Sequence, residues 1–138
     1  MSRSRRWLVT TLPVILCVPL SALAQQVPKM PRVGMLGGSP QTSAAFRQGL
    51  AELGYVEGRT LLLEEQRPAT PDALDASATE LVGRRVDVIF AVSTPAARAA
   101  LRATQTIPIV FSGLADPVGA GLARTLARPG GNATGLSA

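Results

Sequence analysis

Residues 86–92 read VDVIFAV, and this run decides the fold class of the chain. It is short, almost continuously apolar and rich in β-branched side chains, as is typical of a strand buried on both faces of a parallel sheet. An alanine-rich helix is expected next, at residues 96–104, and a second apolar strand (IPIVF) at residues 107–111. We therefore expect the two strands to be adjacent, central and parallel.

Side chains alternate between the two faces along a strand. Within VDVIFAV, Val88 and Phe90 should lie on one face, and Ile89 and Ala91 on the other. Since both faces of such a strand are covered, a carboxylate introduced at Val88 should be buried without a partner and should unfold the domain.

The same alternation of strands and helices extends along the rest of the chain. Further strands are predicted at residues 32–36, 60–65 and 133–137, and further helices at 43–53, 71–85 and 118–127. Such alternation implies right-handed crossovers between parallel strands. The sequence therefore predicts an α/β fold, with a Rossmann-like or flavodoxin-like parallel sheet of four or five strands and helices on both faces.

The first residues of the chain have the pattern of a secretory signal peptide. A basic start at residues 2–6 precedes an apolar run at residues 8–23, and Ala22-Leu23-Ala24 forms a small-x-small cleavage site. A membrane anchor is the alternative, but the run is broken by prolines and is shorter than the roughly 20 apolar residues of a span. We expect cleavage after Ala24 and a periplasmic location.

Removal of residues 1–24 would leave a leader at residues 25–31 and one folded domain at residues 32–138. Three of the 14 basic residues and none of the nine acidic residues lie in the removed segment. The remaining net charge is +2 instead of +5, so nucleic-acid binding loses its main support.

The composition also argues against most catalytic chemistry. The sequence contains no histidine, and its one cysteine, Cys17, lies in the predicted signal peptide. Thiol nucleophiles, Ser-His pairs and ordinary zinc sites are therefore not expected. Gly34, Gly37 and Gly38 do not form a GxGxxG fingerprint, and the P-loop lysine is missing. We expect no enzyme, no metal and no cofactor.

Four predicted helices begin with a capping residue followed by proline. The pairs are Ser39-Pro40, Thr70-Pro71, Thr94-Pro95 and Asp116-Pro117. Each is a good helix start, because the cap accepts a backbone N–H and proline loses none that would be bonded. Whether the pairs do more than cap is open from the residues alone. In a parallel sheet, however, they would gather at the carboxyl edge, where open α/β sheets bind ligands.

The loops after the first, third and fourth strands should lie nearest the point where strand order reverses. They offer Gly37 and Gly38 before Ser39, the pair Ser93 and Thr94, and Asp116 after Gly113. Free N–H groups and partial positive charge at helix starts suit a carboxylate or another anion. Thr70 follows an outer strand, so we interpret it as a cap only.

Four segments carry a resemblance to a known family: PRVGMLGGSP at 31–40, FRQGLAELGYVEG at 46–58, TIPIVFSGLADPV at 106–118 and RPGGNATGLS at 128–137. Together they resemble the ABC transporter substrate-binding family that includes tryptophan- and tyrosine-type binding proteins. The likeness covers nearly all of the chain after the signal peptide.

The resemblance implies a receptor made of two Rossmann-like lobes that close on a small solute, such as an amino acid, and deliver it to an ABC permease at the inner membrane. This chain would be the N-terminal lobe. By the same resemblance Ser39, Ser93, Thr94 and Asp116 would face the interlobe cleft and bind the ligand.

Members of that family are about twice as long as this chain, so we expect a fragment, a truncated reading frame or a decayed gene. A lone lobe would bind its ligand weakly and would be prone to self-association. Two other readings stay open: a small-molecule sensor or regulatory domain of the same fold, and a fragment that binds nothing. A small Rossmann-type enzyme is a further class, disfavoured by the missing histidine, cysteine and phosphate-loop chemistry.

Overall fold

The computed structural model describes residues 29–122, 124 and 131–137, and within them the chain forms one parallel sheet flanked by helices. The elements are β1 (Arg32–Gly37), α1 (Pro40–Glu52), β2 (Leu62–Gln66), the 3-10 turn η2 (Pro71–Ala73), α2 (Leu74–Gly83), β3 (Val88–Val92), α3 (Thr94–Ala103), β4 (Ile109–Leu114) and β5 (Ala133–Ser137). The predicted signal peptide lies outside the described residues. Among the described helices, none is long and apolar enough to cross a membrane.

The strand order is β2-β1-β3-β4-β5, and every neighbouring pair is parallel. This order is that of flavodoxin-like folds. The strand expected at the centre of the sheet is indeed central, because β3 pairs with β1 on one side and with β4 on the other. The predicted α/β fold class is confirmed.

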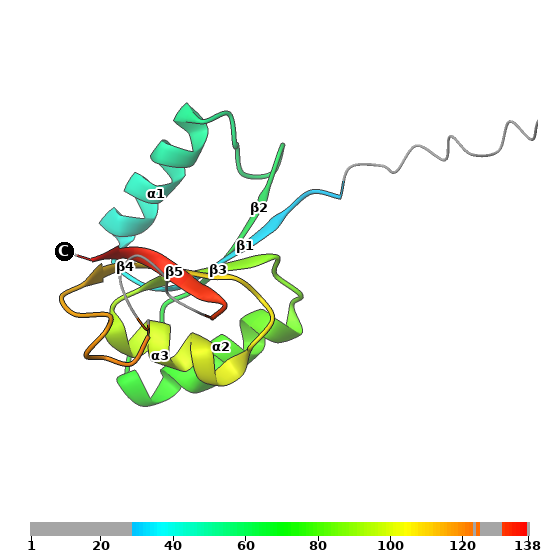
Figure 1. The fold of residues 1–138 in the computed structure, drawn as a ribbon. Coiled ribbons are helices and arrows are strands. Elements are labelled where there is room, and N and C mark those ends of the chain that lie inside the picture. Colours follow the sequence, from blue (N-terminus) through cyan, green and yellow to red (C-terminus); the bar gives the residue numbers. More distant parts are fainter. Residues whose placement is uncertain (1–28, 123, 125–130, 138) are drawn as a thin grey trace, which may run out of the picture.

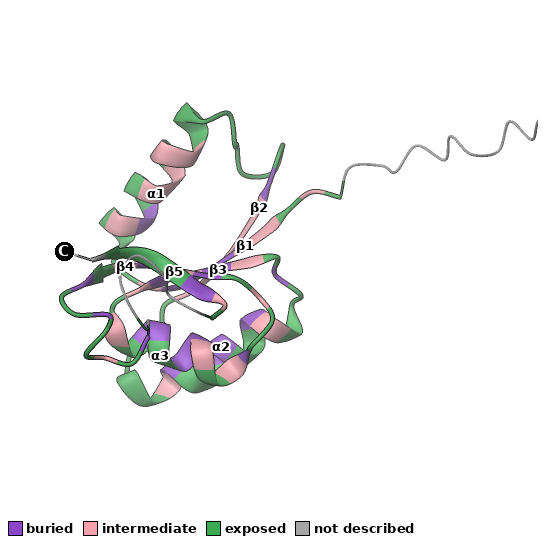
Figure 2. Cartoon of the chain, viewed as in Figure 1, coloured by how far each residue is buried: buried purple, intermediate pink, exposed green. Residues whose placement is uncertain are grey.

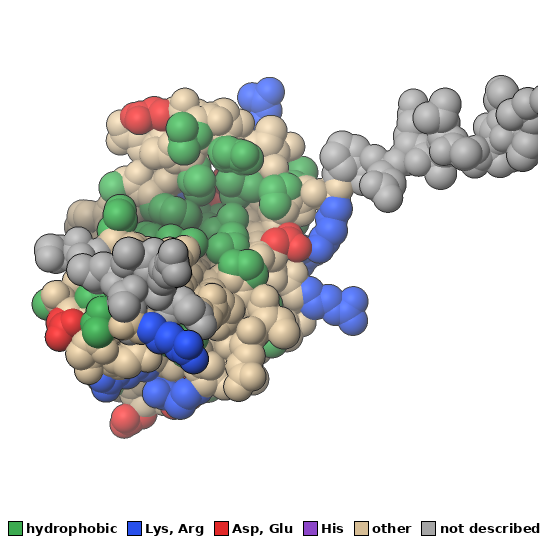
Figure 3. Space-filling model, viewed as in Figure 1, with side chains coloured by type: hydrophobic (Ala, Val, Ile, Leu, Met, Phe, Trp, Pro, Cys, Tyr) green, Lys and Arg blue, Asp and Glu red, His purple; other side chains and the backbone are tan. Residues whose placement is uncertain are grey.

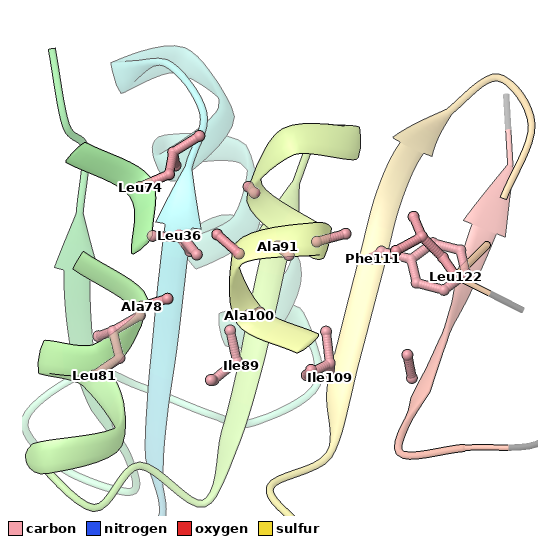
Figure 4. Packing of buried hydrophobic residues seen from close by; sticks show 14 of the residues in the cluster. Leu36, Leu74, Ala78, Leu81, Ile89, Ala91, Ala100, Ile109, Phe111 and Leu122 are labelled. Atoms are coloured by element: carbon pink, nitrogen blue, oxygen red, sulfur yellow. The ribbon is translucent and has the colours of Figure 1, made fainter. Parts of the chain in front are cut away.

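The helices lie on both faces of the sheet, as predicted (Figure 1). Helices α2 and α3 cover one face together, and α1 stands on the opposite face. The core fills the space between α2, α3 and the strands (Figure 4). Four fully buried alanines let α3 approach the sheet closely: Ala96, Ala97, Ala99 and Ala100.

The two faces of β3 alternate as the sequence predicts. Ile89 and Ala91 are fully buried in the core beneath α2 and α3. Phe90 points to the other face and stacks on Phe46 of α1, with ring centroids 4.4 Å apart. Val88, by contrast, is only partly buried, so the expectation of an inaccessible Val88 is wrong. The described chain places only α1 on that face, and α1 leaves part of it open.

Polar contacts tie α1 to β2. The hydroxyl of Ser43, which is buried, donates a hydrogen bond to Glu65. Arg47 reaches Glu65 at 2.7 Å and Glu57 at 2.6 Å. The hydrogen bond to Glu57 and the nearby charge of Glu65 raise the pKa of the Arg47 guanidinium. This network attaches α1 to β2, and α1 packs on the sheet less extensively than α2 and α3 do.

Apolar side chains remain accessible on the α1 side of the molecule. Buried residues gather in α2, α3 and the strands, whereas α1 is mostly exposed or intermediate (Figure 2). Hydrophobic side chains gather below α1 and over the strands (Figure 3). The most exposed large ones on the described chain include Leu53, Tyr55 and Leu136.

The predicted fourth helix, at residues 118–127, is not seen where the chain is described. Residues 117–121 form turns, while 123 and 125–130 lie outside the described residues. The side chain of Asp116 accepts a hydrogen bond from the Gly119 N–H at 2.8 Å, and Gly121 has a φ of +73°. A glycine with a positive φ at this point ends the helical turn that begins at Asp116 and Pro117.

The turn before β5 is fixed by one amide. Asn132 donates through Nδ2 to the carbonyl oxygens of Ile107 at 2.8 Å and Thr104 at 3.2 Å. These contacts join Asn132, at the entry of β5, to the loop before β4.

The difference between the two faces of β3 can be tested with matched substitutions. Ile89→Asp should abolish cooperative unfolding, because its carboxylate would be buried without a partner. Val88→Asp, one residue away but only partly buried, should cost less and leave a folded protein. Ile89→Ala should lower the free energy of unfolding by about 2–5 kcal/mol. Urea denaturation followed by circular dichroism measures all three, and equal effects of the two aspartates would contradict the assignment of faces.

Candidate ligand-binding site

The strand order of the sheet reverses direction between β1 and β3. From β1 the chain crosses through α1 to β2, on one side, and from β3 it crosses through α3 to β4, on the other. The two strands are paired up to their carboxyl ends, where Gly37 lies opposite Val92. In open α/β sheets this point is where ligands bind.

Two glycines turn the chain from β1 into α1. Gly37 has a φ of +82° and Gly38 a φ of +83°, values that favour glycine. A Cβ atom at Gly37 would also lie 3.0 Å from the carbonyl oxygen of Val92. The next residue, Ser39, is the N-cap of α1, and its Oγ accepts a hydrogen bond from the Thr42 N–H at 3.2 Å. The turn therefore exposes main-chain atoms of two glycines, and the exposed hydroxyl of Ser39 follows them.

Ser93 joins β3 to α3 in a strained conformation. Its φ of +103° and ψ of 156° belong to a region used almost only by glycine, at a cost of about 1–3 kcal/mol. Its N–H donates to the Ser112 carbonyl of the neighbouring strand at 3.3 Å, and its Oγ lies 3.5 Å from the Ala96 nitrogen. Ser93, and not Thr94 as expected, is the N-cap; Pro95 occupies the second helical position.

A cavity of about 410 Å³ lies beside this junction. Pockets for small molecules are typically about 300–1,000 Å³. The strand ends and loops at the carboxyl edge line it: Gly37 and Gly38 at the end of β1, Arg67 and Thr70 after β2, and Val92 and Ser93 at the end of β3. The cavity thus lies at the switch point of the sheet.

The four predicted site residues are not all in this cavity. Ser93 lines it, and Ser39 follows directly on Gly38 without being part of the lining. Thr94 instead lines a neighbouring hollow of about 340 Å³ with Arg98 and Arg102. Asp116 is exposed, and its carboxylate caps the turn at Gly119. The structure therefore brings Ser93 together with the two glycines and leaves Thr94 and Asp116 outside.

Two polar residues of the cavity were not predicted. Thr70 was interpreted as a cap, but its side chain makes no capping hydrogen bond to the start of η2 and lines the cavity instead. Arg67, in contrast, belongs to no motif of the sequence. Both follow β2, which ends at the same carboxyl edge, so their position after that strand was the available signal.

A smaller hollow of about 200 Å³ lies between α1 and β2, lined mainly by apolar residues such as Leu50, Tyr55 and Leu63. It offers few polar groups to orient a small solute. The switch-point cavity, in contrast, combines hydroxyls, exposed backbone and a guanidinium. Within residues 29–122 and the other described positions, no group of three or more His, Cys, Asp or Glu side chains could hold a metal.

A family model described as ABC transporter substrate binding protein matches residues 38–138. A curated relative, the tyrosine-binding protein of Clostridioides difficile (strain R20291), is 39% identical over 93 residues. That alignment spans 67% of this chain and 27% of the relative, so the matched part is about a quarter of the relative's length.

Solved structures agree on the fold. A conserved domain protein from Vibrio cholerae is 37% identical with a TM-score of 0.71, over 79% of this chain and 39% of that one. The ligand-free, open structure of a substrate binding protein with adhesive properties from Clostridium difficile is 34% identical with a TM-score of 0.69, over 77% and 37%. An ABC domain in complex with L-Trp from Streptococcus pneumonia is 27% identical with a TM-score of 0.69, over 78% and 38%.

The strain at Ser93 can be separated from its capping role. Ser93→Ala removes the cap and keeps the unfavourable φ, so it should lower the free energy of unfolding by about 1 kcal/mol. Ser93→Gly should be at least as stable as the wild type, because glycine loses only a few tenths of a kcal/mol as a cap and relieves the strain. Thr79→Ala, which removes an exposed hydroxyl within α2, is the control. Equal losses for the alanine and glycine variants of Ser93 in urea denaturation would show that Ser93 is not strained.

Proposed function

This chain belongs to the ABC transporter substrate-binding protein family, and we propose that it forms the first lobe of an extracytoplasmic receptor for a small solute of the amino-acid class. In this proposal the chain binds and does not catalyse. The solute lies against the carboxyl edge of the sheet, in the cavity between the loops after β1, β2 and β3.

The observation that carries the proposal is the position of that cavity at the switch point. Two backbone turns without side chains, at Gly37 and Gly38, let a ligand approach the main chain. Ser93 keeps a hydroxyl there in spite of an unfavourable backbone conformation, a combination that clusters at ligand-binding positions. Helices α1 and α3 both begin at this edge, where their free N–H groups favour an anionic group.

The names of two relatives support an amino acid as the solute. One is a tyrosine-binding protein, and one solved neighbour was crystallised in complex with L-Trp. Among the predicted site residues, we propose Ser93 as a direct contact and Ser39 as the residue that fixes the turn beside it. For Thr94 and Asp116 we propose that they face the cleft and contact the ligand only when a second lobe closes on it.

The aligned part of each solved neighbour is 37–39% of its length, which supports a cleft completed by residues outside this sequence. A micromolar affinity corresponds to about −8 kcal/mol of binding free energy. If one lobe provides about half of the favourable contacts, it retains about −4 kcal/mol, close to a millimolar affinity. We therefore expect weak but site-specific binding by this chain alone.

The proposal includes export and delivery. Residues 1–24 would direct the chain to the periplasm, and an ABC permease at the inner membrane would receive the solute. Exposed apolar side chains such as Leu53, Tyr55 and Leu136 support a tendency of the chain to self-associate.

Binding can be tested by nuclear magnetic resonance, which detects millimolar affinities. Titration of the ¹⁵N-labelled chain with L-tryptophan should shift the amide signals of Gly38, Thr70 and Ser93 in a saturable manner. The amides of Thr79 and Gly83, in the part of α2 far from its start, serve as the internal control and should not move. Absence of saturable shifts at the cavity, or equal shifts in both sets, would refute the proposed function.

Export has its own test. Expressed with residues 1–24 in a Gram-negative host, the chain should appear in the periplasmic fraction with Gln25 as its first residue, as determined by intact-mass spectrometry. The reason is the small-x-small pattern that ends at Ala24. An uncleaved chain in the membrane fraction would be the opposite result.

A further inference from the structure

We propose that Arg67 selects ligands that carry a carboxylate, a role that rests on the proposed function of the cavity and specifies the chemistry of its ligand. The guanidinium would bind the carboxylate end of the solute, and the rest of the solute would extend toward the open side of the cavity.

The charge of the cavity points to this role. Of the described side chains that line it, Arg67 carries the only charge. The other polar side chains of the lining, Thr70 and Ser93, are neutral hydroxyls that can donate to an anion. Among these described lining residues, none offers a carboxylate that could take up the ammonium group of an amino acid. The cavity is therefore electrostatically suited to the anionic end of a zwitterion and not to a cationic amine.

Arg67 can bind a ligand because its contact with its ionic neighbour, Glu65, is loose. The Nη2 atom of Arg67 lies 3.4 Å from Oε2 of Glu65, longer than the roughly 2.7–2.9 Å of a charge-assisted hydrogen bond. The other carboxylate oxygen, Oε1 of Glu65, is held by Arg47 at 2.7 Å and by the Ser43 hydroxyl. Since Arg67 makes only this one long contact among the described residues, most of its N–H donors remain available.

The geometry of a guanidinium suits a carboxylate in particular. Its N–H groups form a planar fork that can donate two parallel hydrogen bonds to the two carboxylate oxygens. The Arg67 side chain is 40% exposed and is part of the cavity lining, and its backbone directly follows β2. The helix starts at Ser39 and Ser93 add partial positive charge at the same edge.

Three related probes separate the two ends of the ligand. L-tryptophan carries both charges, indole-3-propionate retains the carboxylate without the ammonium, and tryptamine retains the ammonium without the carboxylate. Titrated into the wild-type chain and followed by amide shifts, the first two should bind with comparable affinity. Tryptamine should bind at least about tenfold more weakly, the factor expected for loss of one hydrogen-bonded charge pair.

Variants of Arg67 provide the second arm. Arg67→Gln should weaken L-tryptophan binding by about tenfold or more and remove the preference over tryptamine, whereas Arg67→Lys should retain part of both. Arg59→Gln, an exposed arginine in the turn before β2, is the matched control and should bind like the wild type. The melting temperatures of all variants should stay near that of the wild type, because Glu65 keeps Arg47.

The outcomes are distinguishable. If tryptamine binds the wild-type cavity as tightly as L-tryptophan, the role of Arg67 is refuted while the binding function stands. If Arg67→Gln binds L-tryptophan normally, the same conclusion follows. If none of the three probes shifts the cavity amides of the folded wild type, the proposed function and the role of Arg67 fail together.

Discussion

The parallel pairing of β1 with β3 is the contact on which the rest of the structure depends. It continues to the carboxyl ends of both strands, where Gly37 lies opposite Val92. Because the chain leaves β1 toward one side of the sheet and β3 toward the other, α1 and α3 begin at the same edge but lie on opposite faces. The cavity exists at this edge because the two connections diverge there, and the loop after β2 closes its third side.

Small residues make this arrangement possible. Gly37 passes so close to Val92 that a side chain would touch its carbonyl oxygen, and the alanines of α3 bring that helix directly onto the sheet. The opposite face of the sheet is covered less fully, because α1 is the one described helix on it. The Ser43–Glu65–Arg47 network and the stacking of Phe46 on Phe90 attach this helix to the sheet. A parallel sheet is ordinarily covered on both faces. The part of this face that α1 leaves uncovered therefore exposes apolar side chains of the described chain.

The sheet could be predicted well from the sequence because the buried strands β3 and β4 are apolar and rich in β-branched residues. The lining of the switch-point cavity differs from the predicted set, since capping signals locate a helix start but not the direction of the side chains near it. Pro95 is compatible with the first or the second helical position. The sequence therefore did not distinguish Thr94, the expected N-cap, from Ser93, the observed one. Thr70 and Arg67 were missed because β2 is an edge strand, and how far its loop reaches toward β1 depends on tertiary structure. The helix expected after Asp116 is absent from residues 118–122, where Gly119 and Gly121 favour a turn.

The central claim is that the β1–β3 switch point is the surface that contacts the solute. Intermolecular nuclear Overhauser effects between L-tryptophan and the labelled chain measure this directly, because they require protons of the two molecules to be close. The account predicts effects from the ligand to the backbone amides of Gly38 and Ser93. Effects confined to the hollow at Tyr55, or to the hollow between Thr94 and Arg102, would contradict it.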